Sequence, residues 1–418
     1  MEFNKYKLKD LTVNGKGEYG IGAPAVKYSP NLYKYLRITD IDDIGFINTN
    51  QMKSINDKNE EKYLLKANDI VFARTGNSTG KSYFYNSDDG PLVYAGFLIK
   101  FSLDPTKLNP KYLRYYTLTN EYKGWINQFS IGSTRKNINA KIFGDMVISL
   151  PPRYYQDFVV DILDSLERKV KINKQMVANL EELSQTLFKH WFVDFEFPDE
   201  DGNPYKSSGG EMIDSELGEI PSDWKVGVLS DMTEIIMGQS PKSDTYNNNK
   251  VGLPLLNGAS DFKNRNIKPT KYTSAPKKIG HNLDYVFGVR ATIGLVTELD
   301  GEYAIGRGAG LSKNNEENRE FIYEILNQAF TYFERIGSGS VYINISSKDL
   351  KQYKLIIPSK QVLMKYHYQL EPIFSELHNR KEQITSLTNL RDTLLPKLMS
   401  GELEIPDDIE VNIDEFSI

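Results

Sequence analysis

Apolar residues recur along two segments of the chain in alternating steps of four and three residues. In the first segment the repeated positions are Val159, Leu163, Leu166, Val170, Asn173, Val177, Leu180, Ser184, Leu187 and Trp191. In the second they are Tyr366, Leu370, Ile373, Leu377, Arg380, Ile384, Leu387, Arg391, Leu394 and Leu398. This spacing is typical of the packing seam of a coiled coil. It predicts two long helices, over residues 151–193 and 358–400.

Polar residues interrupt both seams at the same two places, Asn173/Arg380 and Ser184/Arg391. A polar residue within a seam lowers stability but fixes the register and the partner. We therefore expect the two helices to pack on each other in antiparallel fashion. The alternative is that each helix lies separately on its own domain. Pro372 predicts a kink or a late start in the second helix, because proline cannot donate the backbone hydrogen bond of a helix interior.

The two segments belong to an internal duplication with a constant offset of 207 residues. At this offset Leu150-Pro151-Pro152 aligns with Ile357-Pro358-Ser359, Gly132-Ser133 with Gly339-Ser340, and Asn137-Ile138 with Asn344-Ile345. A duplicated chain makes a pseudo-symmetric molecule, and such a molecule usually binds a target that also has two halves.

The segments that precede the helices predict two related mixed domains, residues 1–150 and 224–357. Short strands are expected at Leu36–Thr39, Asp69–Ala73 and Tyr94–Phe101, and a helix near Pro110–Trp125. In the second copy, Asp284-Tyr285-Val286-Phe287 repeats Asp69-Ile70-Val71-Phe72, and a helix is expected over Arg319–Glu334. The offset there is 215, so the copies share a frame but differ in their loops. This difference indicates two modules with different ligands.

The predicted fold class is α+β, with two pseudo-symmetric αβ recognition domains joined by two long helices that form an antiparallel coiled coil. Residues 194–223, rich in glycine, proline and serine, are expected to be an acidic linker without an ordered scaffold, and residues 401–418 an acidic tail. Forty helical residues would span roughly 60 Å at about 1.5 Å per residue, so the helices could hold the domains at a fixed spacing.

Charge is distributed unevenly along the chain. The formal net charge is −5, but residues 194–223 carry ten acidic residues and one lysine, and residues 401–418 carry seven acidic residues and no base. The rest of the chain has 50 Lys and Arg against 39 Asp and Glu. A basic body of this kind suits a nucleic-acid partner. Acidic tails that only aid solubility are the alternative interpretation.

Cysteine is absent and the four histidines are scattered, which argues against disulfide and zinc sites. The sequence has no run of eighteen apolar residues and no leader-like amino terminus, so we expect a cytoplasmic protein.

The segment Thr75-Gly76-Asn77-Ser78-Thr79-Gly80-Lys81-Ser82 resembles a phosphate-binding loop, but its first glycine stands one position late. The following Tyr83-Phe84-Tyr85 favours a strand, whereas that motif requires a helix. Small hydrogen-bond donors flanked by Arg74 and Lys81 suit a DNA backbone better.

Two other motifs lack residues that a catalytic site would need. Leu150-Pro151-Pro152-Arg153 lacks the polar and aromatic residues of an amino-methyltransferase motif, and no matching cofactor loop is present. Glu167-Arg168-Lys169 lies on a predicted helix with no upstream Pro-Asp pair. The sequence therefore predicts no catalytic constellation.

Polar and basic loop residues occur at matching places in the two copies. Arginine and asparagine can read guanine and adenine edges, whereas serine and threonine contact phosphates or bases. The candidate DNA-binding residues are Arg74, Thr75, Asn77, Ser78, Lys81, Ser133, Thr134, Arg135, Lys136, Arg290, Arg307, Ser338, Ser340, Tyr342 and Asn344.

The order of these segments resembles the specificity subunit of type I restriction-modification enzymes. The resemblance rests on the variable domain, Leu-Pro-Pro and long helix, then Gly-Glu-Ile-Pro-Ser-Asp-Trp at 218–224, the second variable domain, Ile-Pro, and a long helix that closes in Leu398-Met399-Ser400-Gly401-Glu402-Leu403. It covers essentially the whole chain.

The resemblance implies a non-catalytic subunit that reads a bipartite, asymmetric site in double-stranded DNA, one half with each domain. It implies docking of two modification subunits, which bring S-adenosylmethionine and the adenine methyltransferase site, and of restriction subunits, which bring ATP-driven translocation and Mg. This chain itself would then hold no cofactor. Two alternatives stay open: a coiled-coil scaffold whose repeated domains bind protein or glycan, and an enzyme that uses the Gly76–Ser82 loop.

Overall fold

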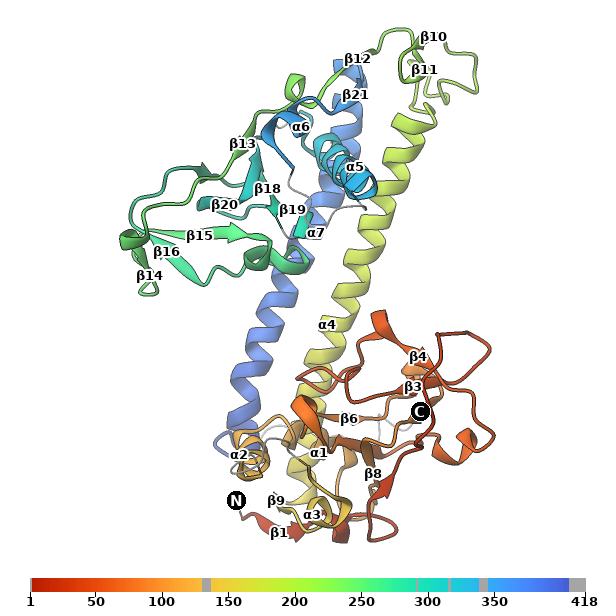
Figure 1. The fold of residues 1–418 in the computed structure, drawn as a ribbon, viewed down its shortest axis with the longest axis vertical. Coiled ribbons are helices and arrows are strands. Elements are labelled where there is room, and N and C mark those ends of the chain that lie inside the picture. Colours follow the sequence, from red (N-terminus) through yellow and green to blue (C-terminus); the bar gives the residue numbers. More distant parts are fainter. Residues whose placement is uncertain (1, 130–136, 291, 315–316, 338–344, 406–418) are drawn as a thin grey trace. The chain divides into compact units, whose positions relative to one another are not determined.

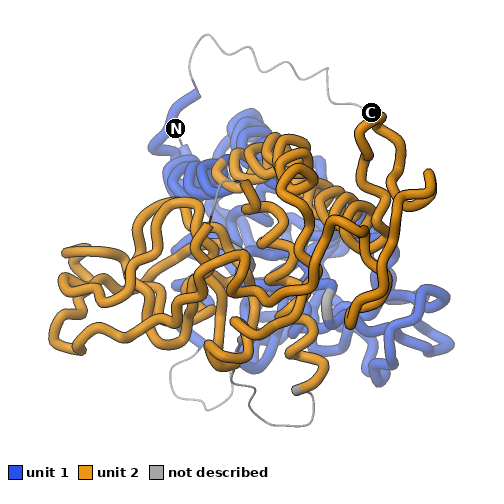
Figure 2. The backbone as a smooth tube through the Cα atoms, turned by 90° about the horizontal axis from the view of Figure 1, so that it is seen from above, with its two compact units in different colours: residues 1–172, 383–418 blue, residues 173–382 orange. Residues whose placement is uncertain are grey.

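The computed structural model describes residues 2–129, 137–290, 292–314, 317–337 and 345–405. The chain forms two compact units, residues 1–172 with 383–418 (unit 1) and residues 173–382 (unit 2), which Figure 2 shows in two colours. Helix α4 (Arg153–Phe188) passes from unit 1 into unit 2, and helix α7 (Lys360–Met399) passes from unit 2 back into unit 1 (Figure 1). Each unit therefore combines an αβ module with a part of both long helices.

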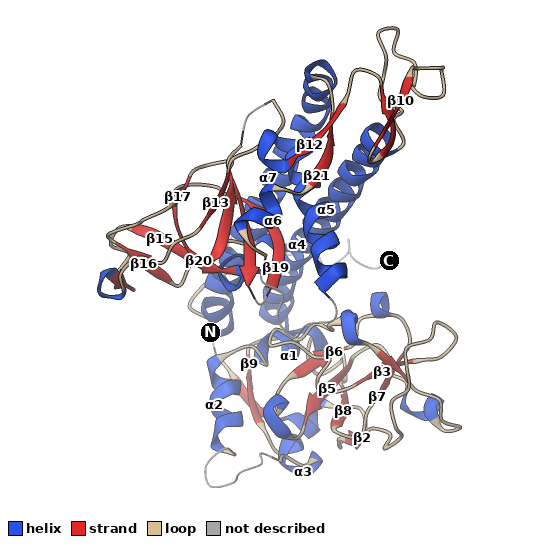
Figure 3. Cartoon of the chain, turned by 45° about the horizontal axis from the view of Figure 1, so that its top comes forward, coloured by secondary structure: helices blue, strands red, loops and turns tan. Residues whose placement is uncertain are grey.

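The αβ module of unit 1 contains three small sheets, ordered β2-β8-β5-β6, β4-β3-β7 and β1-β9. Figure 3 draws the strands in red. Its strands are β1 (Asn4–Lys7), β2 (Glu18–Tyr19), β3 (Lys34–Leu36), β4 (Lys53–Ser54), β5 (Asp69–Ala73), β6 (Ser82–Phe84), β7 (Leu92–Tyr94), β8 (Leu98–Ser102) and β9 (Val147–Leu150). Its helices are α1 (Pro110–Tyr116), α2 (Asn120–Gln128) and α3 (Ala140–Gly144).

Strand β5 is fully buried because apolar clusters cover both of its faces. Ile70 and Phe72 pack into the cluster that also covers the start of α4, whereas Val71 and Ala73 pack into the cluster around β3 and β7. Successive side chains of a strand point to opposite faces, so one continuous apolar run serves both clusters.

The module of unit 2 is dominated by one larger sheet, ordered β14-β16-β15-β20-β18-β19, with β13 and β17 also paired to β20. The strands of this unit are β10 (Met212–Ser215), β11 (Gly218–Pro221), β12 (Lys225–Val228), β13 (Ile235–Met237), β14 (Tyr246–Asn247), β15 (Leu253–Gly258), β16 (Lys271–Thr273), β17 (Ile279–Gly280), β18 (Tyr285–Arg290), β19 (Thr292–Glu298), β20 (Tyr303–Ser312) and β21 (Lys354–Ile357). Its helices besides the long pair are α5 (Arg319–Gly337) and α6 (Ser347–Lys351).

The duplication seen in the sequence is also present in the structure. Helix α3, strand β9 and helix α4 begin at residues 140, 147 and 153, and α6, β21 and α7 begin 207 residues later, at 347, 354 and 360. Asp69 and Asp284 close equivalent turns: Asp69 accepts from the Lys66 amide at 2.8 Å, and Asp284 from the His281 amide at 2.9 Å. The predicted fold class, two αβ domains joined by two long helices, is confirmed.

Several local expectations differ from the structure. The segment Tyr94–Phe101 is not one strand, because β7 ends at Tyr94 and β8 begins at Leu98. The helix expected over Pro110–Trp125 is two helices, and the Thr119 side chain caps the second by accepting from the Tyr122 amide. The strand expected at Leu36–Thr39 ends at Leu36.

The expectation of an irregular start at Pro372 is wrong. Helix α7 is continuous from Lys360 to Met399. Pro372 is exposed, so its ring lies on the outer face of the helix, away from the packed side formed by Leu370 and Phe374. A proline in this place removes one helical hydrogen bond without disturbing the core.

The acidic segment 194–223 has an ordered scaffold, contrary to expectation. Phe195 and Phe197 are 7% and 4% exposed, and both pack on the buried Trp224. Phe197 also stacks on Tyr205 at 4.6 Å between ring centroids. A hairpin of β10 and β11 follows. The composition suggested flexibility, but the aromatic residues within the segment anchor it to unit 2.

Candidate nucleic-acid interface and helix pair

In unit 1, three segments meet at the end of β5. The Arg74 amide donates to the Phe97 carbonyl at 3.0 Å, which joins the β5–β6 loop to the β7–β8 loop. The Ile138 amide donates to the Arg74 carbonyl at 2.9 Å, which brings in the segment before α3. Because these loops converge from distant parts of the chain, their exposed side chains form one surface.

Arg74 is a basic residue of this surface. Among the described residues, no carboxylate forms an ion pair with it. Its guanidinium lies 5.0 Å from the ring centroid of Tyr19, and its Nη2 donates to Asn137 Oδ1 at 3.3 Å. The Tyr19 hydroxyl in turn accepts from the Ala140 amide. These contacts orient the side chain but do not neutralise its charge, so Arg74 can still contact a phosphate or a base.

The other predicted residues of this loop lie in a tight turn. Thr75, Asn77 and Ser78 are exposed or half-buried, and the turn uses Gly76 and Gly80 at φ +72° and +90°. The chain then enters β6, so a strand follows the loop, as Tyr83-Phe84-Tyr85 had indicated.

Lys81 lies in the same turn, but its charge is neutralised. Its Nζ is 2.9 Å from an Asp43 carboxylate oxygen and donates to the Ile41 carbonyl at 3.3 Å. The hydrogen bond and charge of Lys81 lower the pKa of the Asp43 carboxyl. Of the two cations predicted here, Arg74 is the better placed for DNA.

In unit 2, Arg307 is exposed near the middle of β20, and Arg290 is the last residue of β18. Eight further candidates lie outside the described residues: Ser133, Thr134, Arg135, Lys136, Ser338, Ser340, Tyr342 and Asn344. Their assignment stays a prediction.

The long helices pair in antiparallel fashion within unit 1. The hydroxyl of Tyr155, near the start of α4, donates to the carbonyls of Leu398 and Leu403 at 3.0 and 2.6 Å. Leu163 of α4 is fully buried in the cluster that also contains Leu398 and Met399 of α7. The beginning of one helix therefore packs on the end of the other.

The same arrangement holds within unit 2. Trp191, just beyond the end of α4, packs on Tyr366 near the start of α7, with ring centroids 5.5 Å apart. Arg380 Nη1 donates to Asn173 Oδ1 at 3.2 Å. Leu370 and Leu377 are 0% and 6% exposed.

The predicted seam residues differ in their burial. Leu163, Val170, Asn173, Leu370 and Leu377 are buried. The rest of the predicted set is half-buried: Leu166, Val177, Leu180, Leu187, Ile373, Arg380, Ile384, Leu387 and Leu394.

Ser184, the other polar seam residue of α4, donates to Glu324 of α5 at 2.9 Å. The spacing rule also missed Phe188, Phe192 and Phe374, whose aromatic bulk in the sequence could have indicated them.

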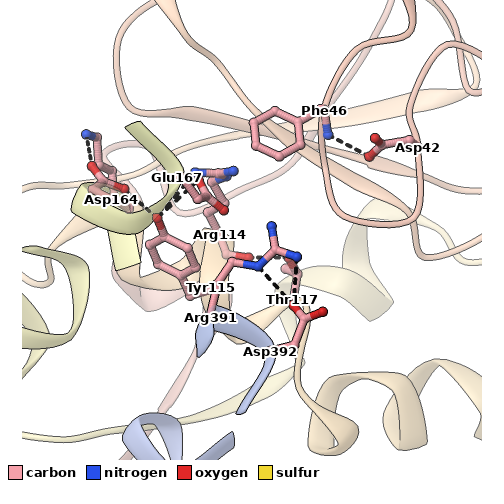
Figure 4. Close-up of polar contacts among 10 residues, drawn as sticks. Asp42, Phe46, Arg114, Tyr115, Thr117, Asp164, Glu167, Arg391 and Asp392 are labelled. Carbon is pink, nitrogen blue, oxygen red and sulfur yellow. Dashed lines mark hydrogen bonds and ion pairs between the residues drawn. The ribbon is translucent and has the colours of Figure 1, made fainter. Parts of the chain in front are cut away.

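Contacts between polar side chains hold each αβ module against a long helix. In unit 1, Arg114 of α1 pairs with Glu167 of α4 at 2.6 Å, and the two side chains are 13% and 10% exposed (Figure 4). Beside them the Tyr115 hydroxyl donates to Asp164 at 2.5 Å, and Lys111 also pairs with Asp164. Glu167, which the sequence placed on a predicted helix without a catalytic partner, is therefore part of the contact between this module and α4.

In unit 2, Glu320 of α5 is 1% exposed and lies 2.9 Å from His367 Nδ1 of α7. Arg319 pairs with the same carboxylate at 3.1 Å. In both units a carboxylate therefore takes part in the contact between the αβ module and a long helix, but the residues differ.

Within the described ranges, no group of three or more acidic or histidine side chains is placed to hold a metal ion. Nor does this part of the chain contain a helix long and apolar enough to cross a membrane.

Comparison with known proteins agrees with this architecture. The family model described as "Type I restriction modification DNA specificity domain" matches residues 2–182 and again residues 221–385. A protein of Methanocaldococcus jannaschii assigned as the specificity subunit of the type I restriction enzyme MjaX is 28% identical over 386 residues, which are 89% of this chain and 88% of that protein.

Two further relatives extend the likeness. The HindI type I restriction enzyme specificity subunit of Haemophilus influenzae is 22% identical over 96% of this chain and all of its own length. The crystal structure of a type I restriction-modification S subunit from M. genitalium has the same fold, with a TM-score of 0.61 and 17% identity over 95% of this chain and 96% of that chain.

Proposed function

The chain belongs to the family of type I restriction-modification DNA specificity domains, and we propose that it reads a bipartite, asymmetric DNA site whose halves are separated by a fixed gap. One αβ module reads each half. The paired helices α4 and α7 set the length of the gap. The chain itself performs no chemistry.

The observation that carries this proposal is a duplicated module with a common frame and different surfaces. The elements before each long helix repeat at an offset of 207 residues, whereas the exposed loops and the charged anchors differ. Two modules that bound the same sequence would be expected to keep the same exposed residues. Different residues on one frame support a target with two unlike halves.

The helix pair also supports docking of modification subunits. In unit 1, Ile172 and Leu390 are 47% and 46% exposed, and in unit 2, Leu183 and Tyr368 are 44% and 70% exposed. Leu183 and Leu390 are repeat equivalents, so both copies expose leucine at one place. Exposed apolar residues on helices that already have a packed seam favour a protein partner.

Under this proposal two modification subunits dock on the helices and supply S-adenosylmethionine and the methyltransferase site. Restriction subunits add ATP-dependent translocation and Mg. None of these groups is assigned to this chain.

Co-expression of the chain with its modification subunit, followed by single-molecule sequencing of adenine methylation, tests the proposal. We expect a gapped two-part motif that disappears when this chain is omitted. Methylation without such a motif, or with a single contiguous motif, would contradict it.

Docking is tested by purifying the complex with Leu183→Asp. This change should reduce recovery of the modification subunit, whereas Gln185→Asp, an exposed change of the same charge on the same helix, should not. Equal recovery with both variants would argue against the helix surface.

A further inference from the structure

In each unit, three chain segments are joined by backbone hydrogen bonds, and these bonds match between the two units. The Gly20 amide bonds the Leu98 carbonyl in unit 1, as the Gly238 amide bonds the Ala309 carbonyl in unit 2. The next residues continue the match, because Ile21 bonds Tyr94 and Gln239 bonds Ile305, at 3.1 and 2.9 Å. These backbone hydrogen bonds show which residue of unit 2 corresponds to which residue of unit 1, whatever their side chains are.

The third segment follows the same alignment. β3 pairs with β7 in parallel with Leu36 opposite Tyr94, and β15 pairs with β20 in parallel with Leu256 opposite Ile305. Gln239, Asn257 and Arg307 of unit 2 therefore occupy the places of Ile21, Arg37 and Gly96 of unit 1.

The side chains at these three places differ sharply. In unit 1, Ile21 is 7% exposed, Gly96 has no side chain, and Arg37 is bound to Asp40 at 2.6 Å. In unit 2 all three residues are exposed: Gln239, Asn257 and Arg307. Their side-chain polar atoms have no hydrogen-bond or ion-pair partner within the described part of the chain.

A β-bulge directs Arg307 outward. The pairing of β15 with β20 shifts between Leu256–Ile305 and Gly258–Gly308, so that Gly306 and Arg307 together lie opposite Asn257. Ile305 is 1% exposed and would share its face with Arg307 in a regular strand, yet Arg307 is exposed. Bulges commonly re-aim a side chain next to a functional site.

Glycines bring the three segments into direct backbone contact. A Cβ on Gly238 would lie 2.2 Å from the Gly306 carbonyl oxygen, and a Cβ on Gly306 would lie 2.3 Å from Asn257 Oδ1. A Cβ on Gly308 would lie 2.2 Å from the Asn257 carbonyl oxygen. Small residues here keep Gln239, Asn257 and Arg307 close together on a surface that a ligand can approach.

We propose that Gln239, Asn257 and Arg307 read base pairs for unit 2. This inference rests on the proposed function and assigns residues to it. Arginine bonds both acceptors of a guanine in the major groove, and asparagine and glutamine bond adenine in the same two-point manner. The half-site of unit 2 therefore contains a G·C pair read by Arg307 and at least one A·T pair read by Asn257 or Gln239.

The same region of unit 1 exposes side chains of a different kind. Phe97, next to Gly96, is 59% exposed, and its carbonyl is bonded to the Arg74 amide. An exposed aromatic ring beside an arginine cannot reproduce the pattern of unit 2. Unlike side chains on one frame are what two unlike half-sites require.

The test uses the complex of the full chain with its modification subunit and DNA duplexes that carry each single base-pair substitution in both halves of the wild-type motif. Competition binding measures discrimination at every position. Arg307→Ala should reduce discrimination about 5- to 150-fold at one G·C pair and leave the other half unchanged. Asn257→Ala and Gln239→Ala should affect A·T pairs in that same half.

Arg307→Lys separates base reading from folding and from charge. Lysine keeps the charge but lacks the two-point geometry, so this variant should bind DNA with most of its affinity and still lose discrimination at the same pair. Lys263→Ala, an exposed change in the same unit, should leave discrimination at every position intact. Thermal unfolding of each variant verifies that the fold is kept.

Full discrimination at every position in the three alanine variants would overturn the assignment while leaving the proposed function in place. Effects spread over both halves would overturn it as well. A wild-type complex with no discrimination at all would instead overturn the proposed function.

Discussion

Asn173 and Arg380 occupy the same position in two copies of one repeat, and they are bonded to each other. Arg380 Nη1 donates to Asn173 Oδ1 at 3.2 Å, and Arg380 Nε also donates to Glu376 at 2.6 Å. In an antiparallel pair, repeat equivalents can meet only at the middle of the pairing. The first of the two polar breaks in each sequence seam is thus one interaction, placed where it fixes the register of both helices.

Single and double replacements of this pair should distinguish its effect on stability from its effect on the register of the two helices. Arg380→Leu alone removes the hydrogen bond that Arg380 donates to the buried Asn173 and should lower the free energy of unfolding by about 1–3 kcal/mol. The double change Asn173→Leu with Arg380→Leu should recover that loss but permit wrong pairing, seen as self-association in sedimentation. Asn379→Leu, on the exposed face of α7, serves as the control. A double variant that stays monomeric would refute the register role.

The buried pair Arg114–Glu167 should behave unlike an exposed pair. Removing one partner leaves an uncompensated charge at the contact of α1 with α4, so Arg114→Met should lower the free energy of unfolding by about 3–5 kcal/mol. Changing both residues to methionine should cost much less. The pair Lys171–Asp88, with side chains 54% and 62% exposed, is the control and should contribute at most about 1 kcal/mol. Urea denaturation of the single and double variants measures this, and additive losses would contradict it.

Glu298 should give a pH-dependent loss of stability. Burial raises the pKa of its carboxyl, although Arg319 lies 3.9 Å away and opposes the shift. The folded chain therefore holds this proton to higher pH than the unfolded chain. Stability is unaffected by Glu298 below the ordinary carboxyl pKa and falls as pH rises through the raised value.

Glu298→Gln should accordingly raise the Tm at neutral pH, by about 2–4 °C for each kcal/mol recovered, and the gain should vanish as pH falls to about 4. Thermal scans over this pH range measure the effect. Glu302→Gln, with a side chain 61% exposed in the wild type, is the matched control. An unchanged Tm for Glu298→Gln at neutral pH would count against the buried-carboxylate interpretation.

The long helices were predictable because one physical rule, the spacing of apolar residues, decides them. The starts of α4 and α7 differ by the 207 residues of the sequence repeat, and Asn173 and Arg380 were identified as matching polar positions. The same rule could not show that Ser184 donates a hydrogen bond to Glu324 of α5. That contact depends on how the αβ module lies on the helices.

The candidate site was only partly predictable for the same reason. Arg74 and Lys81 look equivalent in the sequence, but Asp43, forty residues away, neutralises only Lys81. Gln239 and Asn257 carry no local pattern at all. Their relation to Arg307 depends on hydrogen bonds among β13, β15 and β20, which no sequence periodicity reports.

Arg74 and Lys81 should therefore differ in DNA binding. Each phosphate contact contributes about 0.9 to the slope of log affinity against log salt concentration. Arg74→Ala should lower the magnitude of that slope by about 1, whereas Lys81→Ala should change it less, because Asp43 already neutralises the lysine. Fluorescence anisotropy with the modification subunit bound, from about 50 to 200 mM salt, measures both. A larger effect for Lys81 would reverse this ranking.

The gap of the methylated motif, read by single-molecule sequencing, tests directly whether the helix pair sets the spacing of two independent half-sites. The variant carries one additional helical turn of about four residues after Val177 in α4 and a matching turn after Glu376 in α7. The expected result is a motif with a longer gap and both halves unchanged. A motif with the original gap, or with altered bases in either half, would contradict the division of the chain into two readers and one spacer.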